Sequence, residues 1–168
     1  MEKVIFLDRD GVINQKPPPH QYILRWKNFH LLPGVVEAIK LLNDSGYKVI
    51  VVSNQRCVAL KQATYQQIEY IHDKTNQLLN AYGANIDLFL FCPHDYGQCN
   101  CRKPDIGLFQ KAENFFEINK TESWMIGDSF TDIVAGTAYG INSLRIQEPA
   151  DNIHSFTSLL EAVKYLLK

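Results

Sequence analysis

Short, uninterrupted apolar runs alternate with amphipathic stretches along most of the chain, and this alternation limits the possible folds more than any other feature. Runs of this kind are typical of strands covered on both faces, as in a parallel sheet. Five strands are predicted, at 4–7, 49–52, 88–91, 124–126 and 143–146. We therefore expect an α/β fold, a doubly wound three-layer α/β/α sandwich with a central parallel sheet and right-handed crossovers.

Apolar residues at helical spacing mark the segments between and after these strands, and glycines or a cap residue mark several of their ends. In the third segment, Leu108, Ala112 and Phe115 are expected to share one face. The predicted helices are 35–42 before Gly46, 68–79 before Gly83, 108–115, 133–138 before Gly140, and a C-terminal helix through Leu167 with Ser158 and Glu161 as a capping box.

Length and charge restrict the class of protein. The 168 residues fit one domain, expected to span 1–168, and the net charge of -1 gives no sign of a nucleic-acid partner. The N-terminal apolar run is too short for a signal peptide, and no segment reaches the ~20 apolar residues of a membrane span. We expect a cytoplasmic protein without a membrane partner. A monomer is the default, because nothing in the sequence indicates an oligomer.

Polar residues follow three of the predicted strands at their carboxyl ends, where open α/β sheets bind ligands. Asp8 and Asp128 together suit Mg²⁺, which prefers oxygen ligands. A phosphate on the same cation would leave one carboxylate as nucleophile and another as acid/base. The alternative, that the aspartates only cap helices or lie in turns, is disfavoured by the convergence of three strand ends. The three stretches are D-R-D-G from Asp8, S-N-Q from Ser53 and G-D-S-F-T-D from Gly127.

Three of the four cysteines lie together with a histidine in C-P-H-D-Y-G-Q-C-N-C. Cys92, His94, Cys99 and Cys101 supply the Cys₃His ligand set of a closed tetrahedral Zn²⁺ site, which stabilises without catalysing. A redox site fits less well, because C-x-C differs from the C-x-x-C of thioredoxin-like proteins and leaves the histidine without a role. The fourth cysteine, Cys57, is expected to be an ordinary thiol.

The stretch D-R-D-G-V-I-N resembles the first motif of the haloacid dehalogenase (HAD) superfamily of phosphatases, and three further motifs follow in the family's order. This resemblance implies that Asp8 is the nucleophile that forms an aspartyl-phosphate and that Asp10 is the acid/base. It implies that Ser53 and Lys103 stabilise the phosphoryl group. Asp8 and Asp128 would be Mg²⁺ ligands, joined by the backbone carbonyl of Asp10. The fold implied is the HAD-like α/β/α sandwich.

The cysteine stretch with the following R-K-P resembles one HAD branch, the heptose bisphosphate and histidinol-phosphate phosphatases. These have no large cap domain, and their zinc-bound loop shapes the substrate pocket. The resemblance places Asn54, Gln55, Arg102 and Lys103 among the substrate-binding residues. Asp132 is expected either to orient the site or to lie in the first turn of a helix, where a carboxylate is favoured.

Two departures from the heptose branch fall on loops that face the substrate. The cysteine loop is short, as in the histidinol-phosphate type. The residues after S-N-Q are R-C-V-A-L-K, from Arg56 to Lys61, instead of Ser-Gly-Ile-Ala-Arg. The extended run Pro17–Pro19 also lies where the family contacts substrate. These changes leave the catalytic set intact and bear only on the identity of the substrate.

The expected function is that of a Mg²⁺-dependent phosphatase acting on a small phosphorylated sugar through an aspartyl-phosphate. The first candidate substrate is D-glycero-D-manno-heptose 1,7-bisphosphate, and the alternative is histidinol phosphate. A nucleic-acid end phosphatase is disfavoured by the near-neutral charge, since polynucleotide affinity comes largely from Lys and Arg contacts. A non-catalytic, zinc-stapled interaction module is disfavoured by the complete catalytic set.

Overall fold

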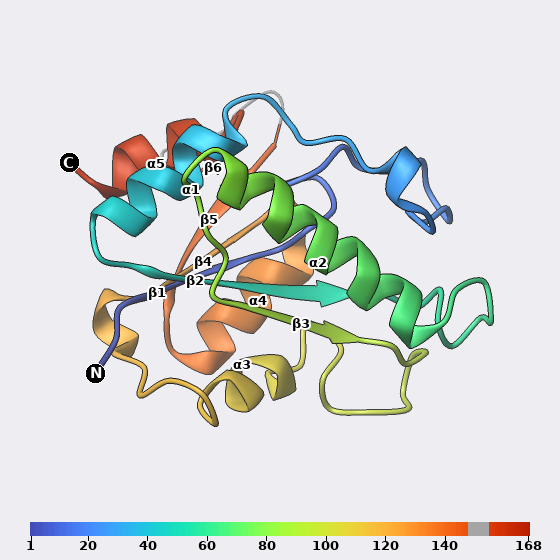
Figure 1. The fold of residues 1–168 in the computed structure, drawn as a ribbon. Helices are drawn as coiled ribbons and strands as arrows, with labels where there is room; N and C mark the ends of the chain where they lie inside the picture. The colour runs from blue at the N-terminus through green and yellow to red at the C-terminus, as the bar shows by residue number, and fades with distance from the viewer. Residues whose placement is uncertain (148–154) are drawn as a thin grey trace.

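The computed structural model describes residues 1–147 and 155–168, and it consists of one parallel sheet between two layers of helices (Figure 1). The sheet has six strands in the order β3-β2-β1-β4-β5-β6, and each neighbouring pair is parallel. The strands are β1 (Val4–Leu7), β2 (Lys48–Asn54), β3 (Leu88–Cys92), β4 (Trp124–Gly127), β5 (Asn142–Ile146) and β6 (Ser155–Phe156). The predicted three-layer fold is confirmed.

Helices cover both faces of the sheet, because each crossover between parallel strands must return over one face. Figure 1 shows α1, α2 and α5 on one side and α3 and α4 on the other. Two short 3₁₀ helices, η1 (Trp26–Asn28) and η2 (Lys120–Glu122), lie in the connections. The α-helices are α1 (Val35–Asp44), α2 (Tyr65–Ala81), α3 (Gly107–Ala112), α4 (Phe130–Tyr139) and α5 (Leu159–Leu166).

Strands β1 to β4 each contribute to two apolar cores, since successive side chains of a strand point to opposite faces. Ile5 and Leu7 of β1 are fully buried against α1, α2 and α5. Val4 and Phe6 are fully buried against α3 and α4, where Phe6 packs on Phe109 with ring centroids 4.8 Å apart. Burial on both faces explains why the strands are uninterrupted apolar runs in the sequence.

Three details differ from the sequence-based expectations. Strand β6 was not predicted, because a two-residue strand is too short to show a period. Helix α3 ends at Ala112, and Phe115 lies beyond it with 58% of its surface exposed, so its predicted place on the helix face is wrong. At α5, Ser158 Oγ accepts from Glu161 N, while the Glu161 carboxylate binds Thr157 instead of completing the box with Ser158.

The sheet order explains where a ligand site can form. Strands β2, β1 and β4 are neighbours, so their carboxyl ends lie together at one edge. Asp8 follows β1, Ser53 lies near the end of β2, and Asp128 follows β4. In residues 1–147 and 155–168, none of the helices has the length and the apolar composition of a membrane span.

Candidate active site and cysteine cluster

Three carboxylates meet at the edge formed by β1 and β4. Oxygen atoms of Asp8, Asp128 and Asp132 all lie within 4.8 Å of one another, and Asp132 is 1% exposed. Gly11 permits this approach, because a Cβ at its position would overlap the Asp128 carboxylate, and its φ of 89° favours glycine. Such a set of hard oxygen donors fits a divalent cation such as Mg²⁺.

Lys103 compensates two of these carboxylates from a buried position. Its Nζ lies 2.9 Å from Asp8 Oδ1 and 2.6 Å from Asp132 Oδ1, and it also donates to Val52 O at 2.6 Å. The side chain is 2% exposed. Burial acts to lower the pKa of Lys103, but Asp132 and Asp8 outweigh it and raise the pKa, so the ammonium stays charged.

The electrostatics of Asp8 are those of a crowded anionic site. Burial raises the pKa of Asp8 to about 7, Lys103 opposes this, and the neighbouring charges of Asp132 and Asp128 add to it. A bound divalent cation would favour the ionised carboxylate, because it is the largest nearby positive charge. Lys103 therefore does not fully compensate the negative charge of the three carboxylates, and a further cation at the site would be favourable.

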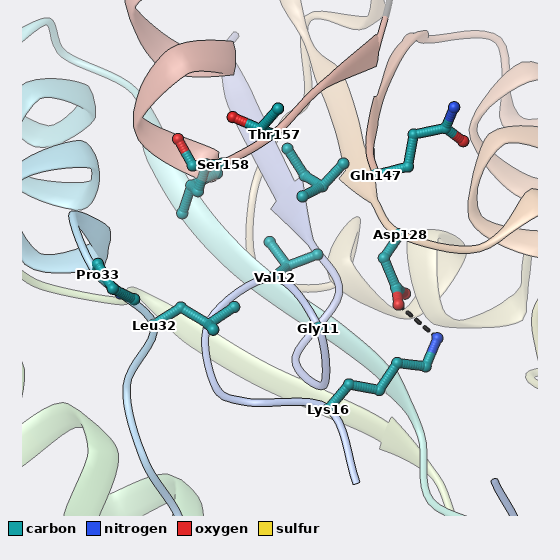
Figure 2. A pocket seen from close by; sticks show the side chains of 11 residues that line it. Gly11, Val12, Lys16, Leu32, Pro33, Asp128, Gln147, Thr157 and Ser158 are labelled. Carbon is teal, nitrogen blue, oxygen red and sulfur yellow. Dashed lines mark hydrogen bonds and ion pairs between the residues drawn. The ribbon is translucent and has the colours of Figure 1, made fainter. Parts of the chain in front are cut away.

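A second lysine supplies positive charge to the carboxylates from the surface of the protein. Lys16 Nζ lies 2.5 Å from Asp128 Oδ2, the contact drawn as a dashed line in Figure 2. Burial acts to lower the pKa of Lys16, but the hydrogen bond to Asp128 and the charge of the carboxylates outweigh it and raise the pKa. Lys16 and Asp128 border a cavity of about 460 Å³ whose other walls come from the loop before α1 and the start of α5.

Asp10 lies in a separate network of donors. Its Oδ1 accepts from Asn14 Nδ2 at 2.9 Å and from the Arg9 guanidinium at 3.1 Å, and its Oδ2 accepts from Gln55 Nε2 at 2.9 Å. Arg9 in turn contacts His72 on α2. The sequence assigned no role to Arg9, Asn14 or His72, although Arg9 and Asn14 lie in the stretch D-R-D-G-V-I-N.

The segment after β2 connects this network to Lys103. Ser53 is 1% exposed and its Oγ accepts from Gln55 Nε2 at 2.8 Å. The amide of Asn54 binds the backbone of Lys103 on both sides, donating to its O and accepting from its N at 3.0 Å each. Asn54 and Gln55 thus hold the neighbouring site residues, and their predicted contact with substrate stays a prediction.

The four predicted zinc ligands converge in space. The Sγ atoms of Cys92 and Cys99 are 3.5 Å apart, those of Cys99 and Cys101 are 3.3 Å apart, and His94 Nδ1 is 3.3 Å from Cys101 Sγ. Tetrahedral zinc with Zn–S bonds of about 2.3 Å places its ligand atoms about 3.8 Å apart. Burial acts to raise the pKa of Cys99, but hydrogen bonds, first from Cys101, lower it to about 7. The cluster is therefore compatible with zinc.

The loop that carries these cysteines also builds one wall beside the site. The Arg102 guanidinium lies 4.3 Å from the centre of the exposed Tyr96 ring, and Arg56 lies 4.7 Å from it. Arg56 also pairs with Asp95 at 2.5 Å, which joins the segment after β2 to the cysteine loop. Arg102 Nη1 is buried and makes no hydrogen bond with the described residues. It borders a cavity of about 380 Å³ that reaches Lys103.

Comparison with known proteins identifies the family. The model of the family described as "Polynucleotide kinase 3 phosphatase" matches residues 3–152. A D-glycero-beta-D-manno-heptose-1,7-bisphosphate 7-phosphatase of Haemophilus ducreyi is 34% identical over 84% of this chain and 81% of its own length. A protein of the same name from Neisseria meningitidis is 36% identical over 82% of this chain and 73% of its own.

Solved structures give the same result. The crystal structure of D,D-heptose 1,7-bisphosphate phosphatase from B. bronchiseptica, complexed with magnesium and phosphate, has a TM-score of 0.88. It shares 25% identity over 98% of both chains. A putative HAD-like phosphatase from Mesorhizobium loti has a TM-score of 0.82 and 25% identity, over 98% of this chain and 87% of that one. The chain belongs to the polynucleotide kinase 3 phosphatase family of HAD-like phosphatases.

Proposed function

We propose that this protein is a Mg²⁺-dependent phosphatase that hydrolyses D-glycero-D-manno-heptose 1,7-bisphosphate at the C7 phosphate. The observation that carries the proposal is the group of the partly buried Asp8 and Asp128 and the buried Asp132, with the buried Lys103 beside Asp8 and Asp132. The names of the relatives support the substrate. The near-neutral net charge of -1 is suited to a small substrate rather than to a polynucleotide.

In this proposal the reaction takes two steps at Asp8. A carboxylate oxygen of Asp8 attacks the phosphorus, the bond to the sugar oxygen breaks, and Asp10 gives its proton to that oxygen. Water then attacks the aspartyl-phosphate while Asp10 takes its proton, which releases inorganic phosphate and restores both carboxyl groups. The sum is one phosphomonoester and one water converted to an alcohol and phosphate.

The negative charge of the transferred phosphoryl group would be stabilised by Lys103, Ser53 and the metal site. The Lys103 ammonium lies beside Asp8 Oδ1, so it would stabilise charge on the equatorial phosphoryl oxygens. The Ser53 hydroxyl is positioned by Gln55 to donate to the same group. Asp8 and Asp128 would hold Mg²⁺, which when bound screens phosphate and carboxylate from each other. The fourth carboxyl group, Asp132, acts through Lys103 and caps α4 by accepting from Ser129 N at 3.0 Å.

Zinc at the cysteine cluster would have a structural role. Its ligands are Cys92 at the end of β3 and three residues of the following loop, which leads directly to Arg102 and Lys103, so the metal would fix the approach of both cations to the site. The cluster lies apart from the three carboxylates, which form a separate group of possible ligands.

Replacing Cys99 with Ser is expected to remove zinc and to lower the thermal unfolding temperature, because one of four ligands is lost. Metal content by atomic emission and unfolding by calorimetry measure the two effects. The matched control is Cys57→Ser, since Cys57 is buried outside the cluster and should leave the zinc content unchanged. Full zinc occupancy in Cys99→Ser would contradict the assignment.

Arg102 is proposed to bind the phosphate that is not transferred. Its guanidinium lies on the Tyr96 ring and borders the cavity that reaches Lys103, so it can meet an anion beside Lys103. Arg102 and Lys103, which are adjacent in the chain, would then each bind one phosphate of the same sugar. The enzyme would thus select substrates by the distance between their two phosphates.

The variant Arg102→Ala should raise KM for the bisphosphate about tenfold or more, since a charge-assisted hydrogen bond contributes about 1.5–3 kcal/mol. The KM for a heptose 7-monophosphate should change less than about threefold, because it has no second phosphate to lose. Steady-state kinetics with both substrates give the comparison. Equal changes in the two KM values would show that Arg102 does not read the second phosphate.

Substrate identity is tested by phosphate release with Mg²⁺ from three compounds at equal concentration. These are the heptose bisphosphate, histidinol phosphate and an oligonucleotide with a 3′-phosphate, the last chosen because of the family's description. The proposal predicts the highest kcat/KM for the heptose bisphosphate. A higher value for histidinol phosphate, in keeping with the short cysteine loop, or for the oligonucleotide would replace the proposed substrate.

A further inference from the structure

Arg9 is a fully buried cation behind the proposed acid/base. Although it lies between Asp8 and Asp10 in the sequence, it is 0% exposed. Its Nη2 lies 3.1 Å from Asp10 Oδ1, its Nε donates to the same oxygen at 3.3 Å, and its guanidinium faces the Phe29 ring at 5.9 Å. A buried guanidinium is unfavourable unless its donors are paired, so the remaining partner of Arg9 is important.

That partner is His72, on the inner face of α2. Arg9 Nη1 lies 3.2 Å from His72 Nε2. Burial, together with the charge of Arg9, lowers the pKa of His72 well below its usual range, so the ring is neutral and Nε2 is free to accept from Arg9. The sequence separation of 63 residues means that the contact joins α2 to the loop after β1.

The ring of His72 cannot turn freely. It is 3% exposed and stacks on Phe89 of β3, with centroids 4.8 Å apart and planes at 16°. Phe91 meets it at 77° from the same strand, with centroids 5.5 Å apart. A ring held on two sides by aromatic side chains presents its nitrogen in one direction, which fixes the guanidinium that donates to it.

We propose that Arg9 and His72 form a positioning pair that sets the orientation of the Asp10 carboxylate. Asn14 and Gln55 each contribute one hydrogen bond to Asp10, whereas Arg9 spans both of its oxygens. Orientation by an outer partner is how metal ligands and catalytic bases are held in many sites, and its loss lowers activity without removing a reacting group. The inference rests on the proposed role of Asp10 as the acid/base.

The test replaces His72 with Phe, which keeps a ring on Phe89 and removes the acceptor, and with Gln, whose Oε1 can accept from Arg9. The matched control is Thr75→Ala on the same helix. Thr75 is 0% exposed and donates to Ile71 O at 2.7 Å, so this change disturbs the buried face of α2 without touching Arg9. Thermal unfolding of all variants shows whether they are folded.

Leaving groups separate positioning of the acid/base from a general loss of structure. An alkyl phosphate needs Asp10 to protonate its leaving alcohol, whereas p-nitrophenolate leaves without a proton. His72→Phe should lower kcat/KM for an alkyl phosphate that the wild type hydrolyses by about tenfold to a hundredfold, and for p-nitrophenyl phosphate by less than about threefold. The kcat of His72→Phe should fall with both substrates, because hydrolysis of the aspartyl-phosphate also needs Asp10 to activate water. p-Nitrophenolate should therefore appear in an initial burst.

His72→Gln should recover most of the lost kcat/KM, and Thr75→Ala should show the wild-type ratio between the two substrates. Equal losses of kcat/KM with the alkyl phosphate and p-nitrophenyl phosphate in His72→Phe would overturn the proposal. A crystal structure of His72→Phe gives a reading independent of turnover, in which a displaced Asp10 carboxylate supports the proposal and an unmoved one overturns it. Wild-type hydrolysis of histidinol phosphate in place of the heptose bisphosphate would contradict only the proposed substrate.

Discussion

Replacing Asp8 with Asn is expected to abolish phosphate release while leaving the chain folded. The amide keeps the shape of the side chain, but it is not a nucleophile, and loss of such a group lowers kcat by at least about 10⁴-fold. The amide oxygen of the variant side chain would still accept from Lys103, as Asp8 Oδ1 does. A neutral group also removes like-charge repulsion from Asp128 and Asp132, so the unfolding temperature without Mg²⁺ should be unchanged or higher.

The measurement is phosphate release with Mg²⁺, accompanied by calorimetry. Asp44→Asn is the matched control, because Asp44 is exposed at the end of α1 and its ion pair with Lys40 lies on the surface. It should keep wild-type turnover and nearly wild-type stability. Turnover by Asp8→Asn within tenfold of the wild type would contradict the proposed nucleophile.

Replacing Lys103 with Met is expected to have the largest combined effect on activity and stability. The change leaves Asp8 and Asp132 without the cation between them, in a place where the lysine side chain is 2% exposed. Breaking a buried ion pair by removing one partner costs about 3–5 kcal/mol. Loss of the charge beside the transferred phosphoryl group should lower kcat by about 10²–10³-fold.

Urea unfolding and steady-state kinetics measure the two effects separately. Lys40→Met serves as the control, since Lys40 lies on the surface of α1 and its pair with Asp44 spans 3.4 Å. An exposed pair of this kind contributes about 0–1 kcal/mol, and the control should keep full activity. Wild-type stability of Lys103→Met would show that the lysine does not compensate these carboxylates.

The sequence alone predicts the fold and the convergence of the main groups. Parallel strands buried on both faces have a clear signal, and the carboxyl ends of adjacent parallel strands meet at one edge. Asp8 and Asp128 therefore come together as expected. Lys103, which was expected at the site from the resemblance to the HAD phosphatases, contacts Asp8. The convergence of the cysteine cluster was also predictable, because all four predicted ligands lie within ten residues of the chain.

Contacts between distant segments were not predictable. Arg9 reads as an ordinary cation between two aspartates, and only the packing of α2 against β3 reveals that His72 accepts from it. Lys16 lies 112 positions from Asp128, within the connection between β1 and η1, which has no periodic pattern. The amide of Asn54 was expected to face substrate, but its contacts with the Lys103 backbone depend on a pairing of loops that no local pattern encodes.

The proposed nucleophile, Asp8, is tested most directly by trapping the phosphorylated enzyme. Wild-type protein is mixed with the heptose bisphosphate and Mg²⁺, quenched in acid within milliseconds, digested and analysed by mass spectrometry. We expect one phosphorylated peptide that contains Asp8, absent without Mg²⁺ and absent in Asp8→Asn. Phosphate release with the modification on another residue would contradict Asp8 as the nucleophile. Full turnover by Asp8→Asn with no trapped species would contradict it as well.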